Sequence, residues 1–82
     1  MQTHNLAFGK AMRQLRKTRK LSQATLALEA GLDRTYISLL ELGQRSPTLD
    51  TLMLLCPVLG VTLTEIASKT QDIQADLEHQ DQ

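Results

Sequence analysis

The chain has 82 residues, 41% of them hydrophobic, with no Trp, one Phe and one Tyr, which suits one small domain with an aliphatic core. Its formal net charge is zero, which argues against a protein that binds polyanions of every kind. No apolar run approaches the roughly 20 residues that cross a bilayer and no signal peptide is evident, so we expect a cytoplasmic protein without a membrane partner.

Helical periodicity begins after a short N-terminal segment. Residues 1–5 are expected to form a loose arm. The first helix is predicted from about Leu6 to Arg19, because Phe8, Met12 and Leu15 recur at i, i+4 and i+7 and form one apolar stripe. No stretch of the chain alternates apolar and polar residues with the period of a strand, and Pro and Gly are few. We therefore predict an all-α fold.

Two short helices joined by a sharp turn are predicted between Ser22 and Gly43. Ser22 is a good N-cap for a helix that begins at Gln23, and Asp33 is a good N-cap for the next helix. Gly31 stands at the turn between them, where glycine reaches a positive φ without steric cost. The inward positions of the two helices carry small or aliphatic side chains: Leu26, Ala27, Ala30, Ile37 and Leu40.

A fourth helix is predicted after a polar turn. Thr48 is its expected N-cap, and Gly60 its expected stop. Pro57 lacks an N–H group and clashes with the carbonyl four residues earlier, so we expect a kink or an early end there. The broad apolar face of this helix is assigned to the core: Leu49, Leu52, Leu55, Cys56 and Leu59.

A capping box from Thr62 to Glu65 predicts the start of a fifth helix. Its first residues Leu63, Ile66 and Ala67 are expected to complete the core, so the domain is assigned to residues 1–68. Residues 69–82 are an acidic extension, either helical or frayed. The stripe of Ile66, Thr70, Ile73 and Leu77 could be the seam of a dimer, a docking helix for another protein, or part of a frayed tail.

The spacing from Gln23 to Gly43 is a helix-turn-helix pattern and resembles the Cro/cI-type repressors of the XRE family. The shared features are Gln23 at the start, Ala27 at the helix crossing, Gly31 with Leu32 at the turn, and paired apolar residues in the second helix. This resemblance implies a five-helix, lambda-repressor-like DNA-binding domain with a C-terminal helical extension. It further implies a homodimer on a near-palindromic operator, with Asp33–Leu42 as the recognition helix in the major groove.

The run Arg34–Ser38 is similar to that of restriction–modification controller proteins and supplies most of the expected DNA contacts. Arg34 can bind guanine O6 and N7 or a phosphate, and Thr35 a base edge or a thymine methyl. Ser38 can donate to a base or a phosphate, and Tyr36 can pack on the preceding helix while its hydroxyl meets the DNA. Leu39 can contact a thymine methyl or fill the helix end.

Two further DNA contacts are expected outside that run. Gln23 can donate to a phosphate, helped by the unpaired N–H groups at a helix start. Arg45 can hold the backbone or the minor groove, or be a solvated loop charge. The family pattern also implies a structural salt bridge between Arg16 and Glu41 that sets the angle of the recognition helix; the alternative is a weak surface pair.

Charge is divided unequally along the sequence. Residues 1–45 hold eight of the nine Lys and Arg but three of the nine Asp and Glu, so they carry +5 and residues 46–82 carry −5. This division indicates one face suited to an anion such as double-stranded DNA, although solvated helix faces could produce it by chance.

The residues of catalytic or metal sites are sparse. His4 and His79 stand near opposite ends, Cys56 lies in an apolar run as an expected buried free thiol, and no Gly-rich phosphate loop occurs. We expect no enzyme activity, no metal and no cofactor. The leading interpretation is a transcriptional regulator. The alternative is a protein-interaction module, such as an antitoxin, that binds a partner protein through its C-terminal helix.

Overall fold

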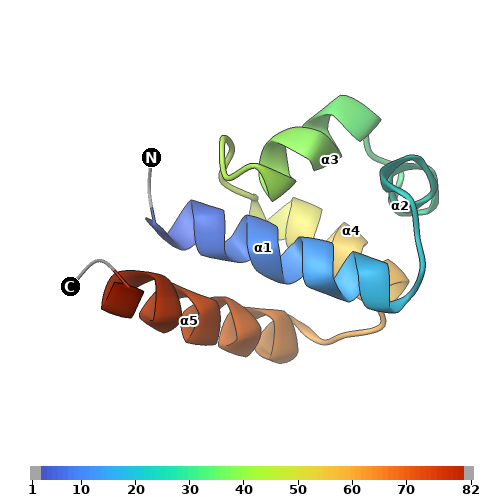
Figure 1. The fold of residues 1–82 in the computed structure, drawn as a ribbon. Coiled ribbons are helices and arrows are strands. Elements are labelled where there is room, and N and C mark those ends of the chain that lie inside the picture. Colours follow the sequence, from blue (N-terminus) through green and yellow to red (C-terminus); the bar gives the residue numbers. More distant parts are fainter. Residues whose placement is uncertain (1–2, 81–82) are drawn as a thin grey trace.

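The computed structural model describes residues 3–80, the side chain of Gln80 excepted, and contains five helices and no strand in that range. The helices are α1 (Thr3–Thr18), α2 (Gln23–Ala30), α3 (Arg34–Glu41), α4 (Leu49–Leu59) and α5 (Leu63–Gln80). Helices α1 and α5 lie side by side and run in opposite directions, with α2 and α3 above them and α4 behind (Figure 1). The predicted all-α, five-helix fold is confirmed.

The start signals of the sequence act at the beginning of three helices, α2, α4 and α5. The Ser22 Oγ accepts a hydrogen bond of 3.0 Å from the Thr25 N–H, and the Thr48 Oγ1 accepts one of 3.0 Å from the Thr51 N–H. At the start of α5, Thr62 and Glu65 exchange hydrogen bonds of 2.9 and 3.0 Å, which is the predicted capping box. These caps satisfy backbone groups that a helix end leaves unpaired.

One core joins all five helices. Its fully buried members are aliphatic, as the composition predicted, and Phe8 is the single buried aromatic ring among the described residues. The largest side chains without exposed surface are Met12, Leu26, Ile37, Leu40, Leu55, Leu59 and Ile66. Because this core takes residues from α1 through α5, the orientation of α2 and α3 depends on the whole domain.

Helix α1 begins earlier than predicted. Its first described turn includes residues 3–5 of the expected loose arm, so the arm prediction is wrong for these residues, whereas Met1 and Gln2 lie outside the described part. The first turn has tertiary partners that local sequence does not reveal: His4 and Asn5 line a hollow shared with α5 and the loop before α4. Packing of an otherwise weak helix end offsets its tendency to fray.

Helix α4 continues through Pro57 and ends at Leu59, so the predicted early end is wrong. Proline removes the hydrogen bond to the Met53 carbonyl, but Met53 is 58% exposed and its carbonyl can bind water instead. The chain turns at Gly60, which has φ 72° and donates to the last-turn carbonyls of α4. The predicted stop at Gly60 is confirmed.

Three residues assigned to the core lie at the surface. Leu49 is 63% exposed, Leu63 is 38% exposed, and Ala67 is also exposed. The core prediction is wrong for Leu49 because α4 is apolar nearly all round, whereas its core contacts are on the side that holds Leu55, Cys56 and Leu59. It is wrong for Leu63 and Ala67 because, of the three apolar residues at the start of α5, only Ile66 reaches the core. The apolar pattern of the sequence therefore predicts more buried residues than the structure has, and part of that pattern forms an exposed apolar surface.

Helix α5 runs without a break through position 68, where the sequence placed the domain boundary. It packs along α1 (Figure 1). In its apolar stripe Ile66 is buried, and Thr70, Ile73 and Leu77 are half-buried. Among the described residues, no single helix is long and apolar enough to span a membrane, and α4 with α5 passes that test only as a pair bent by 98°.

Candidate nucleic-acid interface

The turn between α2 and α3 brings four of the predicted contact residues together. Gly31 has φ 71° at the end of α2, and the Asp33 carboxylate accepts a 2.8 Å hydrogen bond from the Thr35 N–H, which starts α3. Arg34 and Thr35 are exposed, and Ser38 is half-buried one turn further on. A shallow hollow of about 180 Å³ is lined by Gln23, Arg34, Thr35 and Ser38. The hollow is thus surrounded by donors and hydroxyl groups from both helices.

A buried ion pair connects α1 to the end of α3. The Arg16 Nε donates to the Glu41 Oε2 at 2.6 Å and its Nη2 donates to the Glu41 Oε1 at 3.0 Å. The Arg16 Nη1 also donates to the Leu21 carbonyl at 2.8 Å, and both residues of the pair are 9% exposed. The hydrogen bonds to Glu41 raise the pKa of Arg16 against the opposing effect of burial, so this guanidinium stays cationic. The bridge expected from the family pattern is present.

Gln23 is held by the same pair. Its Nε2 donates to the Glu41 Oε1 at 3.0 Å, so one carboxylate oxygen accepts from both Arg16 and Gln23. The side chain of Gln23 is therefore oriented by α1 and α3 although it begins α2. No local sequence pattern links Gln23 to Glu41, because the two residues are 18 positions apart.

Tyr36 lies further inside than the other predicted contact residues. It is half-buried against the core, and its hydroxyl lies 3.1 Å from the Thr51 Oγ1 of α4. Thr51 is 6% exposed and accepts a 3.0 Å hydrogen bond from the hydroxyl of Thr48. Thr51 was not among the predicted residues, although its place three positions after the N-cap Thr48 is a usable signal.

The remaining predicted residues lie at the far end of α3. Leu39 is half-buried, and Arg45 is exposed in the loop that follows. Gly43 holds that loop close to α1: it has φ 75°, and a Cβ at this position would lie 2.8 Å from the Leu6 Cα. The loop that carries Arg45 is thus fixed against α1.

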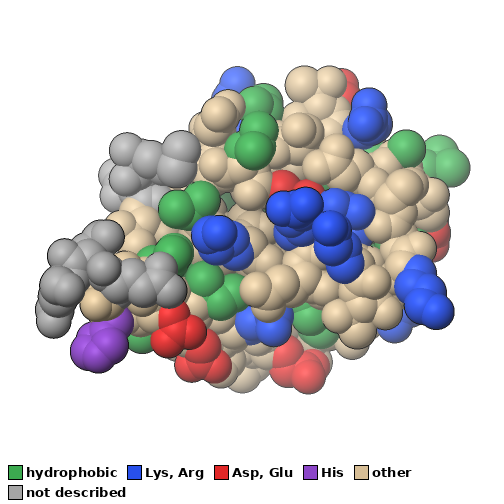
Figure 2. Space-filling view, in the orientation of Figure 1, with side chains coloured by type: hydrophobic (Ala, Val, Ile, Leu, Met, Phe, Trp, Pro, Cys, Tyr) green, Lys and Arg blue, Asp and Glu red, His purple; other side chains and the backbone are tan. Residues whose placement is uncertain are grey.

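Charge is segregated on the surface. Basic side chains gather over α1 at the centre of the face in Figure 2 and also flank α3 above it. Acidic side chains are most frequent along the lower edge over α5, with others at the top, at the right and near the centre. In the part of the chain that the structure describes, no three His, Cys, Asp or Glu side chains form a group suited to a metal ion. Cys56 is buried, and burial raises the pKa of its thiol, which disfavours a reactive thiolate.

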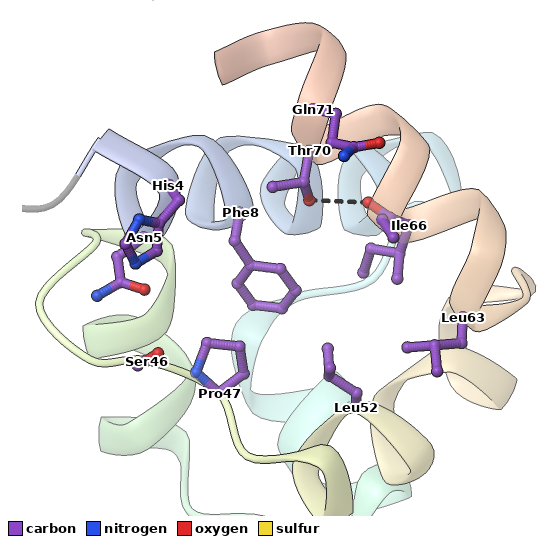
Figure 3. A pocket seen from close by; sticks show the side chains of 11 residues that line it. His4, Asn5, Phe8, Ser46, Pro47, Leu52, Leu63, Ile66, Thr70 and Gln71 are labelled. Atoms are coloured by element: carbon purple, nitrogen blue, oxygen red, sulfur yellow. Dashed lines mark hydrogen bonds between the residues drawn. The ribbon is translucent and has the colours of Figure 1, made fainter.

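A larger, mainly apolar hollow of about 340 Å³ lies away from these residues, between α1, α5 and the loop before α4. Phe8 points into it, with Leu52 and Leu63 across from it and Ile66 above (Figure 3). It contains none of the predicted contact residues.

Comparison with known proteins agrees with this geometry. The family model described as helix-turn-helix matches residues 12–66. The chain belongs to the helix-turn-helix family. Among its relatives is the control protein C.MunI of Mycoplasma sp, which is 41% identical over 64 residues covering 77% of this chain and 86% of that protein. The control protein C.BamHI of Bacillus amyloliquefaciens is 44% identical over 57 residues, covering 68% and 70%.

Solved structures in this family have the same fold. The restriction–modification controller protein C.AhdI of Aeromonas hydrophila superposes with a TM-score of 0.73 at 39% identity, covering 76% of this chain and 94% of that one. The controller protein C.Esp1396I, solved as a tetramer with its natural 35 base-pair operator, has a TM-score of 0.82 at 24% identity, covering 92% and 99%. The predicted resemblance to XRE-family and controller proteins is confirmed, and these relatives are named as control or controller proteins.

Proposed function

We propose that this chain is a sequence-specific DNA-binding transcriptional regulator, acting in the cytoplasm as a homodimer on a near-palindromic operator. The observation that carries the proposal is the hollow at the start of α3, which Gln23, Arg34, Thr35 and Ser38 line together and where Arg34 and Thr35 are exposed. The controller proteins among its relatives support the same assignment.

The N-terminal end of α3 is the part of the molecule suited to the major groove, which is wide enough for one helix. Arg34 can give two parallel hydrogen bonds to guanine, and Thr35 and Ser38 can bond base edges or a thymine methyl. Arg45 holds a flanking phosphate or enters the minor groove. Tyr36 contributes by anchoring α3 to α4 through Thr51, and it reaches DNA only if its hydroxyl leaves that partner.

The network around Glu41 gives the interface its rigidity. Arg16 fixes the end of α3 to α1, and Gln23 is tied to the same carboxylate at the start of α2. The second N–H of the Gln23 amide and the free backbone N–H groups of that helix end remain for a phosphate. Preorganised donors bind with less loss of conformational entropy than mobile ones.

The outward face of α4 is the surface best suited to a second copy of the chain. It carries Leu49, Met53 and Leu54, which are 63%, 58% and 47% exposed, beside Pro57 and a single charge at Asp50. Contiguous exposed apolar side chains mark interaction surfaces. A two-fold dimer through this face would present two recognition helices to half-sites ~34–36 Å apart.

A second candidate is the protein-interaction module, in which the exposed acidic side chains of α5 bind a basic partner protein. Asp72, Asp76 and Glu78 are exposed along this helix. The substitutions D72N, D76N and E78Q together would abolish such an interaction while leaving duplex affinity unchanged, or slightly higher because negative charge is removed.

The test of the leading proposal is duplex binding by fluorescence anisotropy. The probes are a duplex enriched from a random library by the wild-type protein and a scrambled duplex of equal length. We expect Arg34→Ala to reduce the difference in binding free energy between the two duplexes by ~1–3 kcal/mol. Gln23→Ala should weaken binding to both duplexes by the same factor. Lys69→Ala on α5 is the charge-matched control. Equal binding of every duplex by the wild type and by Arg34→Ala would refute base reading.

A further inference from the structure

A row of positive charge on α1 is left unexplained by the recognition residues. Lys10, Arg13 and Lys17 recur at i, i+3 and i+7, and all three are exposed. With Gln14 they line a hollow of about 290 Å³. This basic row is defined as Lys10, Arg13, Gln14 and Lys17. Figure 2 shows basic side chains gathered over α1.

The row is unfavourable for the helix that carries it. Like charges three or four positions apart on a helix repel, and α1 contains no Asp or Glu to offset them. Within residues 3–80 the ion pair found is Arg16 with Glu41, so none of the three cations of the row has an acidic partner there. On a face that contacts only solvent, this arrangement costs stability without any benefit, whereas a bound anion would be attracted by all three charges.

The position of the row relative to α3 indicates which anion it meets. Gly9 lies where α1 crosses the end of α3: a Cβ there would come within 2.5 Å of the Leu40 and Glu41 carbonyl oxygens. The backbones of the two helices therefore approach closely at this point. With α3 in a major groove about 12 Å wide, the phosphate strand that borders the groove lies next to α1.

One end of the row lies in the same turn of α1 as Arg16, which shares Glu41 with Gln23 of α2. Lys17 follows Arg16, and Arg16 and Gln23 donate to the same oxygen of Glu41. From there Arg13 and Lys10 continue along α1 toward the loop that carries Arg45, which Gly43 holds against the start of α1. Basic groups thus extend from Gln23 along one edge of α3.

We propose that the basic row of α1 binds the DNA backbone alongside the groove that α3 enters, as a sequence-independent phosphate track. This inference rests on the proposed function and extends it from base reading to the salt dependence of affinity. The alternative occupant, the exposed acidic side of α5 in a second copy of the chain, is an outcome of the test below.

The test is the slope of log Kd against log salt concentration for one selected duplex. Each phosphate contact contributes about 0.9 to this slope, so the triple variant K10Q/R13Q/K17Q should lose about 0.9 for every contact removed. Its affinity should fall by the same factor on the selected and scrambled duplexes. Its thermal stability should be unchanged or higher, because repulsion within α1 is relieved.

Single variants with equal charge change serve as controls. K10Q, R13Q and K17Q should each lower the slope, whereas K69Q on α5 should leave it unchanged. A triple variant with the wild-type slope overturns the inference while the proposed function survives. An unchanged slope accompanied by an altered oligomeric mass assigns the row to a protein contact instead. Failure of the wild type to bind any duplex overturns both.

Discussion

Removal of Glu41 should show that the ion pair at the end of α3 supports the fold. The substitution Glu41→Gln leaves the Arg16 guanidinium 9% exposed, with the Leu21 carbonyl and a neutral amide as its remaining partners. A buried charge deprived of its counter-ion typically costs ~3–5 kcal/mol. Because the whole domain is stable by only ~5–15 kcal/mol, this loss is a large fraction of the total.

Urea unfolding followed by circular dichroism measures the effect directly. The variant should unfold at a much lower urea concentration with an unchanged slope m, since the fold and its buried area are retained. The control is the double variant Arg16→Met with Glu41→Leu, in which no buried charge is left unpaired. Replacing a buried pair by apolar side chains of similar size is often neutral or stabilising, so this variant should recover most of the lost stability.

Two results would refute this reasoning. A Glu41→Gln variant within ~1 kcal/mol of the wild type would mean that the pair behaves as a surface ion pair. A double variant as unstable as the single one would mean that shape, rather than charge, is what Glu41 supplies. The recovered double variant should still bind duplex DNA more weakly than the wild type, because Gln23 has lost the carboxylate that orients it.

Three further substitutions test separate parts of the structure. Gly9→Ala should destabilise the domain by ~3 kcal/mol or more in urea unfolding, because its Cβ would press against the backbone of Leu40 and Glu41 and force α1 from α3; a loss below ~1 kcal/mol would contradict the close crossing. Lys20→Gly should raise stability by ~0.5–1 kcal/mol, since Lys20 has φ 58° after α1, and a decrease would contradict that assignment. Burial raises the pKa of the Cys56 thiol in the folded protein. The stabilisation that the buried neutral thiol provides is therefore complete below the ordinary thiol pKa and is lost as the pH rises through the raised pKa of the folded state. The alkaline loss of stability should therefore be smaller in Cys56→Ala, and an identical pH profile would place the thiol in water.

Local signals in the sequence were sufficient for most of the fold. N-caps, the glycines after α2 and α4, and one-sided apolar stripes identify helices because each acts within a few residues. The continuation of α4 past Pro57 was not predictable from those rules, because it depends on the burial of Cys56 and Leu59 on either side of the proline. The extension of α1 to Thr3 and the exposure of Leu49 depend likewise on which neighbours are present, and that is tertiary information.

In the candidate site, too, local sequence signals predict some residues, whereas others depend on tertiary contacts. Arg34, Thr35 and Ser38 could be placed on one helix face from spacing alone, and the structure brings them to a common hollow. The capture of Gln23 by Glu41 and of the Tyr36 hydroxyl by Thr51 joins residues 18 and 15 positions apart, beyond the range of any local pattern. The sequence therefore identified the exposed contact residues better than the groups that hold them in place.

Backbone amide chemical shifts are the most direct test that the start of α3 meets DNA. A ¹⁵N-labelled protein titrated with its selected duplex should show its largest shift changes at Gln23, Arg34, Thr35 and Ser38, with smaller changes along the exposed side of α1. Large changes confined to α4 and α5, with the amides at the start of α3 unmoved, would contradict the account.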